Sequence, residues 1–227
     1  MRPYYEHAGI TIYHGDAADV LESLGLHWGD KPFDLLLTDP PYGIDCARAI
    51  HCTKPSRPNT YKFGPKYESG AWDDSRPAPD LMAALLAVAR QHIIWGGNYF
   101  ADMLPPSRGW LFWDKLFEHT TNFSHGELAW TSLDQRLMKF TLSSKAETAG
   151  GKYREHPTQK PEALIEWCFG MVPSARSVFD PFMGSGTTLA TAKRLGLTAV
   201  GVDLEERYCE MAVRRLRQEA LPLEMSS

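Results

Sequence analysis

Short apolar runs recur along the chain, and several are apolar on consecutive residues instead of on alternate ones. Strands with this pattern are covered on both faces, as in a parallel sheet that lies between helices. The apolar runs cover residues 10–13, 33–38, 92–95, 110–113, 177–180 and 199–203. Apolar residues at helical spacing predict helices over 79–90, 161–169, 187–195 and 205–216. This alternation predicts an α/β fold with a mainly parallel sheet.

Two stretches interrupt the alternation in a chain whose 227 residues otherwise suit a single domain. Residues 43–77 contain four prolines and scattered glycines. This segment is too long for a plain connection, so we expect a functional or mobile loop. Residues 116–155 are polar and carry only a weak strand pattern, at 127–130.

The composition excludes a disordered or fibrous protein, because 43% of the residues are hydrophobic and 23% are charged. Lys and Arg number 24 against 28 Asp and Glu, so the formal charge is −4 and no overall basic field indicates nucleic acid. Residues 48–67 differ from this average, because they hold aromatic residues and five cations without an acid. The cations are Arg48, Lys54, Arg57, Lys62 and Lys66. Such a stretch suits phosphates and an unstacked base, and the alternative is an ordinary polar loop.

The cysteines indicate neither a disulfide framework nor a metal site. Cys46, Cys52, Cys168 and Cys209 show no CxxC spacing. His51 lies beside the first pair, but a fourth ligand at a plausible spacing is missing, so we expect no metal. The first residues lack an apolar signal region, and no apolar run has the length of a membrane span. We therefore expect a reduced, soluble, cytoplasmic protein.

The first candidate site follows the apolar run 33–38, where the sequence reads Thr38-Asp39-Pro40-Pro41-Tyr42-Gly43. In open α/β sheets, ligands bind at the carboxyl ends of strands. The two prolines fix the backbone and donate no hydrogen bond, so the turn offers a carboxylate and carbonyl oxygens beside an aromatic ring. It could hold an amino group next to a stacked ring. The alternative is a stiff loop with a capping aspartate.

The second candidate site is FDPFMGSGTT at 179–188, which also follows a strand and opens a helix. Glycines let the backbone approach a ligand, and a helix N-terminus presents free N–H groups to it. The sequence is neither a Walker loop nor the three-glycine dinucleotide motif. Asp203 ends the next strand, near the spacing at which an acid meets ribose hydroxyls. Together these features favour a nucleoside ligand over a tight turn and a helix cap.

These motifs resemble those of the amino-methylating DNA methyltransferases. DPPY at 39–42 precedes FDPFMGSGTT, an order that resembles the circularly permuted β class. Supporting matches are YHGDA at 13–17, HPTQKP at 156–161 and GVD at 201–203. The resemblance covers nearly the whole chain except 116–155. It implies a single Rossmann-like methyltransferase domain over 1–227, with helices on both faces of the sheet.

The resemblance implies S-adenosylmethionine as the cofactor and S-adenosylhomocysteine as the product. Asp203 would hold the ribose hydroxyls, and Gly15, Asp16 and Ala17 would face the adenine. The remaining cofactor contacts would come from Asp39, Asp180, Pro181, Phe182, Gly184, Ser185, Gly186 and Thr187. Lys160 would pair with the methionine carboxylate, and the alternative is a solvated lysine.

The resemblance also implies methyl transfer, without a metal, to the exocyclic amino group of a base in DNA. Asp39 and the carbonyl of Pro40 would accept the amino hydrogens, in a turn that Pro41 stiffens. Tyr42 would stack on the base after it has left the duplex. An Asp at the first DPPY position resembles the adenine-N6 enzymes, and cytosine-N4 methylation is the alternative.

DNA would contact residues 43–77 as a substrate-side loop and 116–155 as a small target-recognition segment, the latter through Arg136 and Lys139. The 40 residues of this segment are few, so a homodimer or a short recognition sequence stays open, as does a cognate restriction enzyme. A methyltransferase for RNA or protein, or a non-catalytic subunit, fits less well. Residues 95–100 and 113–115 either line the site or are core and turn residues.

Overall fold

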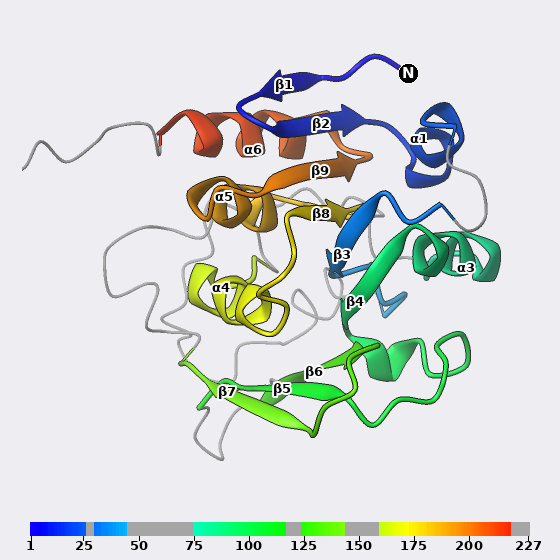
Figure 1. Ribbon diagram of the computed structural model, residues 1–227, viewed down its shortest axis with the longest axis vertical. Helices are drawn as coiled ribbons and strands as arrows, with labels where there is room; N and C mark the ends of the chain where they lie inside the picture. Colours follow the sequence, from blue (N-terminus) through cyan, green and yellow to red (C-terminus); the bar gives the residue numbers. More distant parts are fainter. Residues whose placement is uncertain (26–29, 45–74, 117–123, 144–158, 219–227) are drawn as a thin grey trace, which may run out of the picture.

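The computed structural model describes residues 1–25, 30–44, 75–116, 124–143 and 159–218. These residues form one mixed sheet with helices packed against it (Figure 1). The strands are β1 Tyr5–His7, β2 Ile10–His14, β3 Phe33–Thr38, β4 Ala89–Trp95, β5 Trp110–Asp114, β6 Gly126–Thr131, β7 Met138–Thr141, β8 Ser177–Asp180 and β9 Thr198–Asp203. The helices are α1 Ala17–Ser23, α3 Pro79–Ala87, η1 Gly97–Tyr99, α4 Glu162–Gly170, α5 Thr187–Arg194 and α6 Glu206–Gln218.

The strand order is β1-β2-β9-β8-β3-β4-β6-β5-β7. The five strands from β2 to β4 are mutually parallel, with Leu36 opposite Phe179 where β3 meets β8. β6 runs against both of its neighbours, β4 and β5. β1 is an antiparallel edge strand, and β7 lies parallel to β5 at the other edge. The expected α/β fold with a mainly parallel sheet is confirmed.

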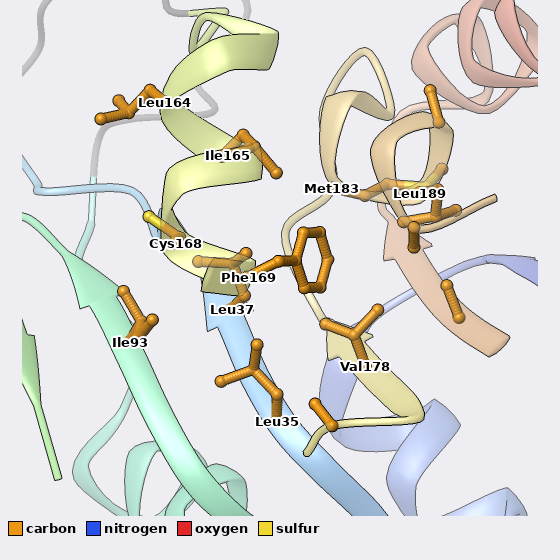
Figure 2. Packing of buried hydrophobic residues seen from close by; sticks show 14 of the residues in the cluster. Leu35, Leu37, Ile93, Leu164, Ile165, Cys168, Phe169, Val178, Met183 and Leu189 are labelled. Atoms are coloured by element: carbon orange, nitrogen blue, oxygen red, sulfur yellow. The ribbon is translucent and has the colours of Figure 1, made fainter. Parts of the chain in front are cut away.

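The consecutive apolar residues of the strands supply two cores, one on each face of the sheet. Leu35 and Leu37 of β3 belong to the core that α4, α5 and α6 cover (Figure 2). Leu36 points to the other face and packs with residues of α1 and α3. Figure 1 shows these two groups of helices on opposite sides of the molecule. The side chains of a strand alternate between faces, so a strand buried on both faces must be apolar at every position.

The sheet has its switch point between β3 and β8. From β8 the chain passes through α5 to β9 on one side, and from β3 it passes through α3 to β4 on the other. The loops that leave the carboxyl ends of β3 and β8 therefore diverge, and ligands of open α/β sheets bind in the crevice between such loops. Both motifs singled out in the sequence start at this point.

All six expected strands and four expected helices are present, with bounds that differ by a few residues. The helix expected over 79–90 ends at Ala87, and β4 begins at Ala89. The predicted helix was too long because the apolar residues at its end fit the spacing of a helix as well as that of a strand. Ala89 belongs to the strand because it pairs with Phe33 of β3. The described residues of 116–155 include β6 and β7, which belong to the main sheet. Four short elements were not predicted: α1, β1, η1 and β7.

Replacing Leu37 by alanine is expected to lower the free energy of unfolding by about 2–5 kcal/mol, because its side chain is fully buried in the packed core. Leu137 is 60% exposed, and the same change there is expected to cost less than about 0.5 kcal/mol. Urea unfolding followed by circular dichroism measures both changes. Equal losses at the two positions would contradict the packing described here.

Candidate functional site

The DPPY turn begins where β3 ends and is joined to the glycine-rich loop by a buried hydrogen bond. Thr38, the last residue of β3, donates from Oγ1 to Asp180 Oδ1 at the end of β8, over 2.8 Å. Asp39 comes next, and the hydroxyl of Tyr42 donates to its Oδ1. Pro40 lies between these two residues in the sequence and is buried. Its ring fixes the backbone and keeps the turn rigid. The sequence therefore places a carboxylate and an aromatic ring at the switch point.

Asp39 lies at one end of a chain of alternating charges. Its Oδ2 accepts a hydrogen bond from Lys160 Nζ. Lys160 Nζ also lies 3.0 Å from Glu127 Oε2, and Lys115 Nζ donates to Glu127 Oε1. Lys160 is only 8% exposed, so its interpretation as a solvated lysine is wrong. Its partners in this structure are the two carboxylates.

Burial and charge oppose each other in this cluster. Burial raises the pKa of Asp39 above its ordinary value, and the charge of Lys160 offsets only part of that rise. Burial would also raise the pKa of Glu127, but Lys160 and Lys115 outweigh it and lower the pKa to about 2. The two carboxylates raise the pKa of Lys160 in spite of its burial, so Lys160 stays positively charged.

The ring of Tyr42 belongs to an aromatic group at the ends of β3 and β4. It stacks on Tyr99 with 4.6 Å between ring centroids and 15° between planes, and it contacts Phe100 edge to face. Tyr99 is 38% exposed, so this stack opens to solvent. Residues 95–100, which the sequence left open between site and core, divide between the two: Trp95 and Phe100 are buried, whereas Tyr99 lies beside the DPPY turn.

Gly96 allows this close approach. Its φ of +69° is a left-handed conformation, and a Cβ there would lie 2.0 Å from Tyr42 Cε1. Gly96→Ala is therefore expected to lower the free energy of unfolding by about 2–5 kcal/mol, from backbone strain together with overpacking. Gly196 has a φ of +72° and open space around it, so Gly196→Ala reports strain alone, about 1–2 kcal/mol. Thermal unfolding of both variants measures the two losses in stability. Equal losses would show that the contact with Tyr42 does not contribute to the cost at Gly96.

The glycine-rich loop packs tightly at the start of α5. Asp180 is 3% exposed, and its Oδ1 also accepts from the backbone N–H of Phe182 over 3.3 Å, so it holds the loop together. Burial raises the pKa of Asp180 to about 6. Gly186 has a φ of +76°, and a Cβ there would lie 2.6 Å from the Cβ of Ala212 on α6. Buried loop residues are Pro181, Ser185 and Thr187, whereas Phe182 and Gly184 are partly exposed.

Asp203 closes the other side of the loop. Its Oδ2 accepts from Gly184 N over 2.9 Å, and its Oδ1 accepts from Glu205 N over 2.9 Å. Burial raises the pKa of Asp203 to about 7. Gly15 N donates to the backbone oxygen of Asp203, because β2 and β9 pair up to His14 and Asp203. The segment expected to face adenine thus lies beside this carboxylate, where Asp16 caps α1 through Ala18 N and Ala17 is buried.

The candidate DNA contacts are only partly placed. Arg48, Lys54, Arg57, Lys62 and Lys66 lie outside the described residues. Arg136 is exposed, and Lys139 on β7 is exposed with its Nζ 2.7 Å from Asp114 Oδ2. Over the ranges that the structure describes, no helix is long and apolar enough to cross a membrane. In the same ranges no group of three or more His, Cys, Asp or Glu side chains could hold a metal ion.

Glu127 was missed as a member of the site. Lys115 belongs to residues 113–115, which the sequence left open between site and turn, and it pairs with Glu127. Nothing in the sequence indicates that Glu127 would lie beside it. β6 is antiparallel to its neighbours, so its first residues reach the edge where the parallel strands end. Recognising Glu127 requires the direction of β6, and a weak apolar pattern at 127–130 does not give it.

Comparison with known proteins identifies the family. The family model described as DNA methylase, for N6 and N4 amino methylation, matches residues 94–214, more than half of the chain. The chain belongs to this DNA methylase family. The match includes Lys160, the glycine-rich loop and Asp203, and it begins after the DPPY turn.

The methylase is also similar to individual proteins over nearly its whole length. The Type II methyltransferase M2.LlaDCHI of Lactococcus lactis subsp. cremoris is 27% identical, over 96% of this chain and 93% of the relative. Among solved structures, the cytosine-N4-specific PvuII DNA methyltransferase has a TM-score of 0.59 at 14% identity, covering 99% of this chain and 91% of the other. The complex of M1.HpyAVI with S-adenosylmethionine (SAM) has a TM-score of 0.55 at 20% identity, covering 91% and 99%. These structures confirm the methyltransferase fold.

Proposed function

We propose that the methylase transfers a methyl group from S-adenosylmethionine to the N6 amino group of adenine in DNA. The observation that carries the proposal is the position of the Asp39 carboxylate. It lies at the carboxyl end of β3, linked through Thr38 and Asp180 to the glycine-rich loop after β8. An acceptor for an amino group and a loop suited to a nucleoside thus meet at the switch point.

The residues around Asp203 fit the cofactor. A buried carboxylate whose pKa is raised to about 7 gains from hydroxyl donors, and the partly exposed Gly184 has no side chain to keep a ligand from the backbone of this loop. We assign Asp203 to the ribose hydroxyls, Gly15, Asp16 and Ala17 to the adenine side, and Phe182 with the 184–187 loop to the rest. The bound cofactor, which M1.HpyAVI holds in its crystal structure, supplies an electrophilic methyl group on sulfur.

The DPPY turn prepares the attacking nitrogen. The lone pair of an exocyclic amino group is delocalised into the base and makes a poor nucleophile. Asp39 and the carbonyl oxygen of Pro40 accept its two hydrogens, which draws the nitrogen toward tetrahedral geometry and localises the lone pair. Tyr42, whose ring stacks on Tyr99 in this structure, would hold the ring of the flipped base by stacking in place of Tyr99. Rigid placement of these acceptors supplies the catalysis, and the amino proton leaves after methyl transfer.

The choice of adenine rests on Asp39. The cytosine-N4-specific PvuII enzyme shares the fold, so fold similarity does not separate the two bases. A carboxylate at the first position of the turn resembles the adenine-N6 enzymes, which is why N6-methyladenine is the product we propose.

The test is methyl transfer from labelled S-adenosylmethionine to DNA, followed by digestion and separation of the nucleosides. Label in N6-methyl-2′-deoxyadenosine supports the proposal. Label in N4-methyl-2′-deoxycytidine would overturn the choice of base, and label in RNA or protein with unlabelled DNA would overturn the substrate class. The homodimer and the cognate restriction enzyme stay predictions, as do the DNA contacts of Arg136, Lys139 and the 43–77 loop.

A further inference from the structure

Glu127 occupies a position that no sequence motif marks. It lies near the start of β6, opposite Trp113 of β5, and its side chain is 22% exposed. The reversed direction of β6 brings it to the edge of the sheet where Asp39 and Lys160 lie. It touches Lys160 on one side and Lys115 on the other.

The charges of this group balance in pairs. Lys160 stands between the carboxylates of Asp39 and Glu127, and Lys115 neutralises the far oxygen of Glu127. The ring of Trp95, whose centroid is 5.8 Å from Lys160 Nζ, packs on the same ammonium group. Lys160 already donates to Asp39 Oδ2 in this structure, and Glu127 shares its charge. If Glu127 were absent, Lys160 would have Asp39 as its only carboxylate among the described residues, and its whole charge would hold the oxygen that has to receive an amino hydrogen.

We propose that Glu127 is a positioning residue, which holds Lys160 by a second ion pair and so keeps Asp39 able to accept the amino hydrogens of the base. This inference rests on the proposed function of Asp39. Glu127 acts through Lys160 and does not itself touch the substrate.

The charged and titratable groups around Asp39 make its pKa, and with it the pH dependence of activity, a test of the inference. These groups are Lys160, Glu127, the hydroxyl of Tyr42, and Asp180, which is hydrogen-bonded to Thr38. Besides burial, Glu127 raises the pKa of Asp39 and Lys160 lowers it. Asp39 accepts hydrogens only as the carboxylate, so activity is lost as pH falls through its pKa. Removing the charge of Glu127 should move this acidic limb of the kcat profile to lower pH.

The test compares Glu127→Gln with the wild-type methylase. We expect kcat to fall about 10- to 100-fold, KM for S-adenosylmethionine to stay the same, and the acidic limb to move to lower pH. Glu127→Asp keeps the charge and should recover part of kcat and the original limb. Glu166→Gln is the matched control, because Glu166 pairs with Arg194 on an exposed surface away from the site. A Glu127→Gln variant with wild-type kcat and limb would overturn the inference.

A second variant moves the limb in the opposite direction. Lys115→Met removes the outer partner of Glu127, so Glu127 attracts Lys160 more strongly and the pKa of Asp39 should rise. This variant decides the question if Glu127→Gln does not fold, and an unmoved limb would then count against the inference.

Carbon-13 NMR titration of the Asp39 carboxyl in the ligand-free protein gives the same answer without any turnover. The pKa of Asp39 should fall in Glu127→Gln and rise in Lys115→Met. If the wild type methylates no adenine, the proposed function fails, and this titration still tests the link between Glu127 and Asp39. If the wild type is active and neither variant moves the pKa of Asp39, the inference fails alone.

Discussion

Replacing Asp39 by alanine is expected to reduce methyl transfer by about 1,000-fold while cofactor binding is largely kept. The variant loses the charged acceptor that prepares the amino nitrogen, and removing one placed hydrogen-bonding group from an active site costs about 100- to 1,000-fold. The fold should survive, because Lys160 keeps Glu127 as a partner. Single-turnover assays with labelled cofactor measure the rate, and calorimetric titration with S-adenosylhomocysteine measures binding.

Glu166→Ala is the matched control for this experiment. Glu166 pairs with Arg194, its side chain is 50% exposed, and we expect wild-type methylation from the variant. Normal methylation by Asp39→Ala would show that the DPPY turn is not the catalytic turn. Loss of both methylation and cofactor binding would instead place Asp39 in the cofactor site.

Replacing Lys160 by methionine is expected to lower the free energy of unfolding by about 3–5 kcal/mol near neutral pH. The change leaves Asp39 and Glu127 as two mostly buried carboxylates without the cation between them, and breaking a buried pair is costly for this reason. Chemical unfolding at a series of pH values measures the loss. Lys139→Met, which breaks an exposed pair with Asp114, is expected to cost less than about 1 kcal/mol.

The pH dependence of the Lys160→Met variant follows from the signs of the pKa shifts. In the wild type the pKa of Glu127 is lowered to about 2, so its contribution to stability is present above its unfolded pKa and disappears as pH falls toward 2. Without Lys160, the folded-state pKa values of both carboxyls rise, and the variant gains stability as they take up protons. The deficit should therefore shrink from about pH 8 to about pH 5. A deficit that is equal at both pH values would contradict the role of the two carboxylates.

Much of the fold could be predicted because the buried strands consist of consecutive apolar residues, a pattern that is visible in the sequence. Leu35, Leu36 and Leu37 are apolar in a row, and the structure divides them between two cores. The end of α3 could not be placed in the same way, because Ala89 suits a helix as well as a strand until it pairs with Phe33. β7 was missed for a related reason: its residues are largely exposed, so no burial pattern marks it.

The candidate site was predictable where a motif follows a strand and hidden where distant segments meet. Asp39, the glycine-rich loop and Asp203 each come directly after an apolar run, and the sheet brings them to one edge. The pairing of Lys160 with Glu127 was unpredictable, because it depends on β6 running against its neighbours. From the sequence, Lys160 was expected either to pair with the methionine carboxylate of the cofactor or to be solvated. In the structure it pairs with Asp39 and Glu127.

The same edge of the sheet has a consequence for how such an enzyme diversifies. β3, β5 and β7 run in one direction, so the connections 39–78, 115–125 and 142–161 all leave from the end where the DPPY turn lies. The strands on which these connections begin are fixed by the two cores. We expect that exchanging residues 43–78, 116–125 and 142–159 between relatives changes the DNA contacts and leaves Asp39, Tyr42, Lys115 and Lys160 in place.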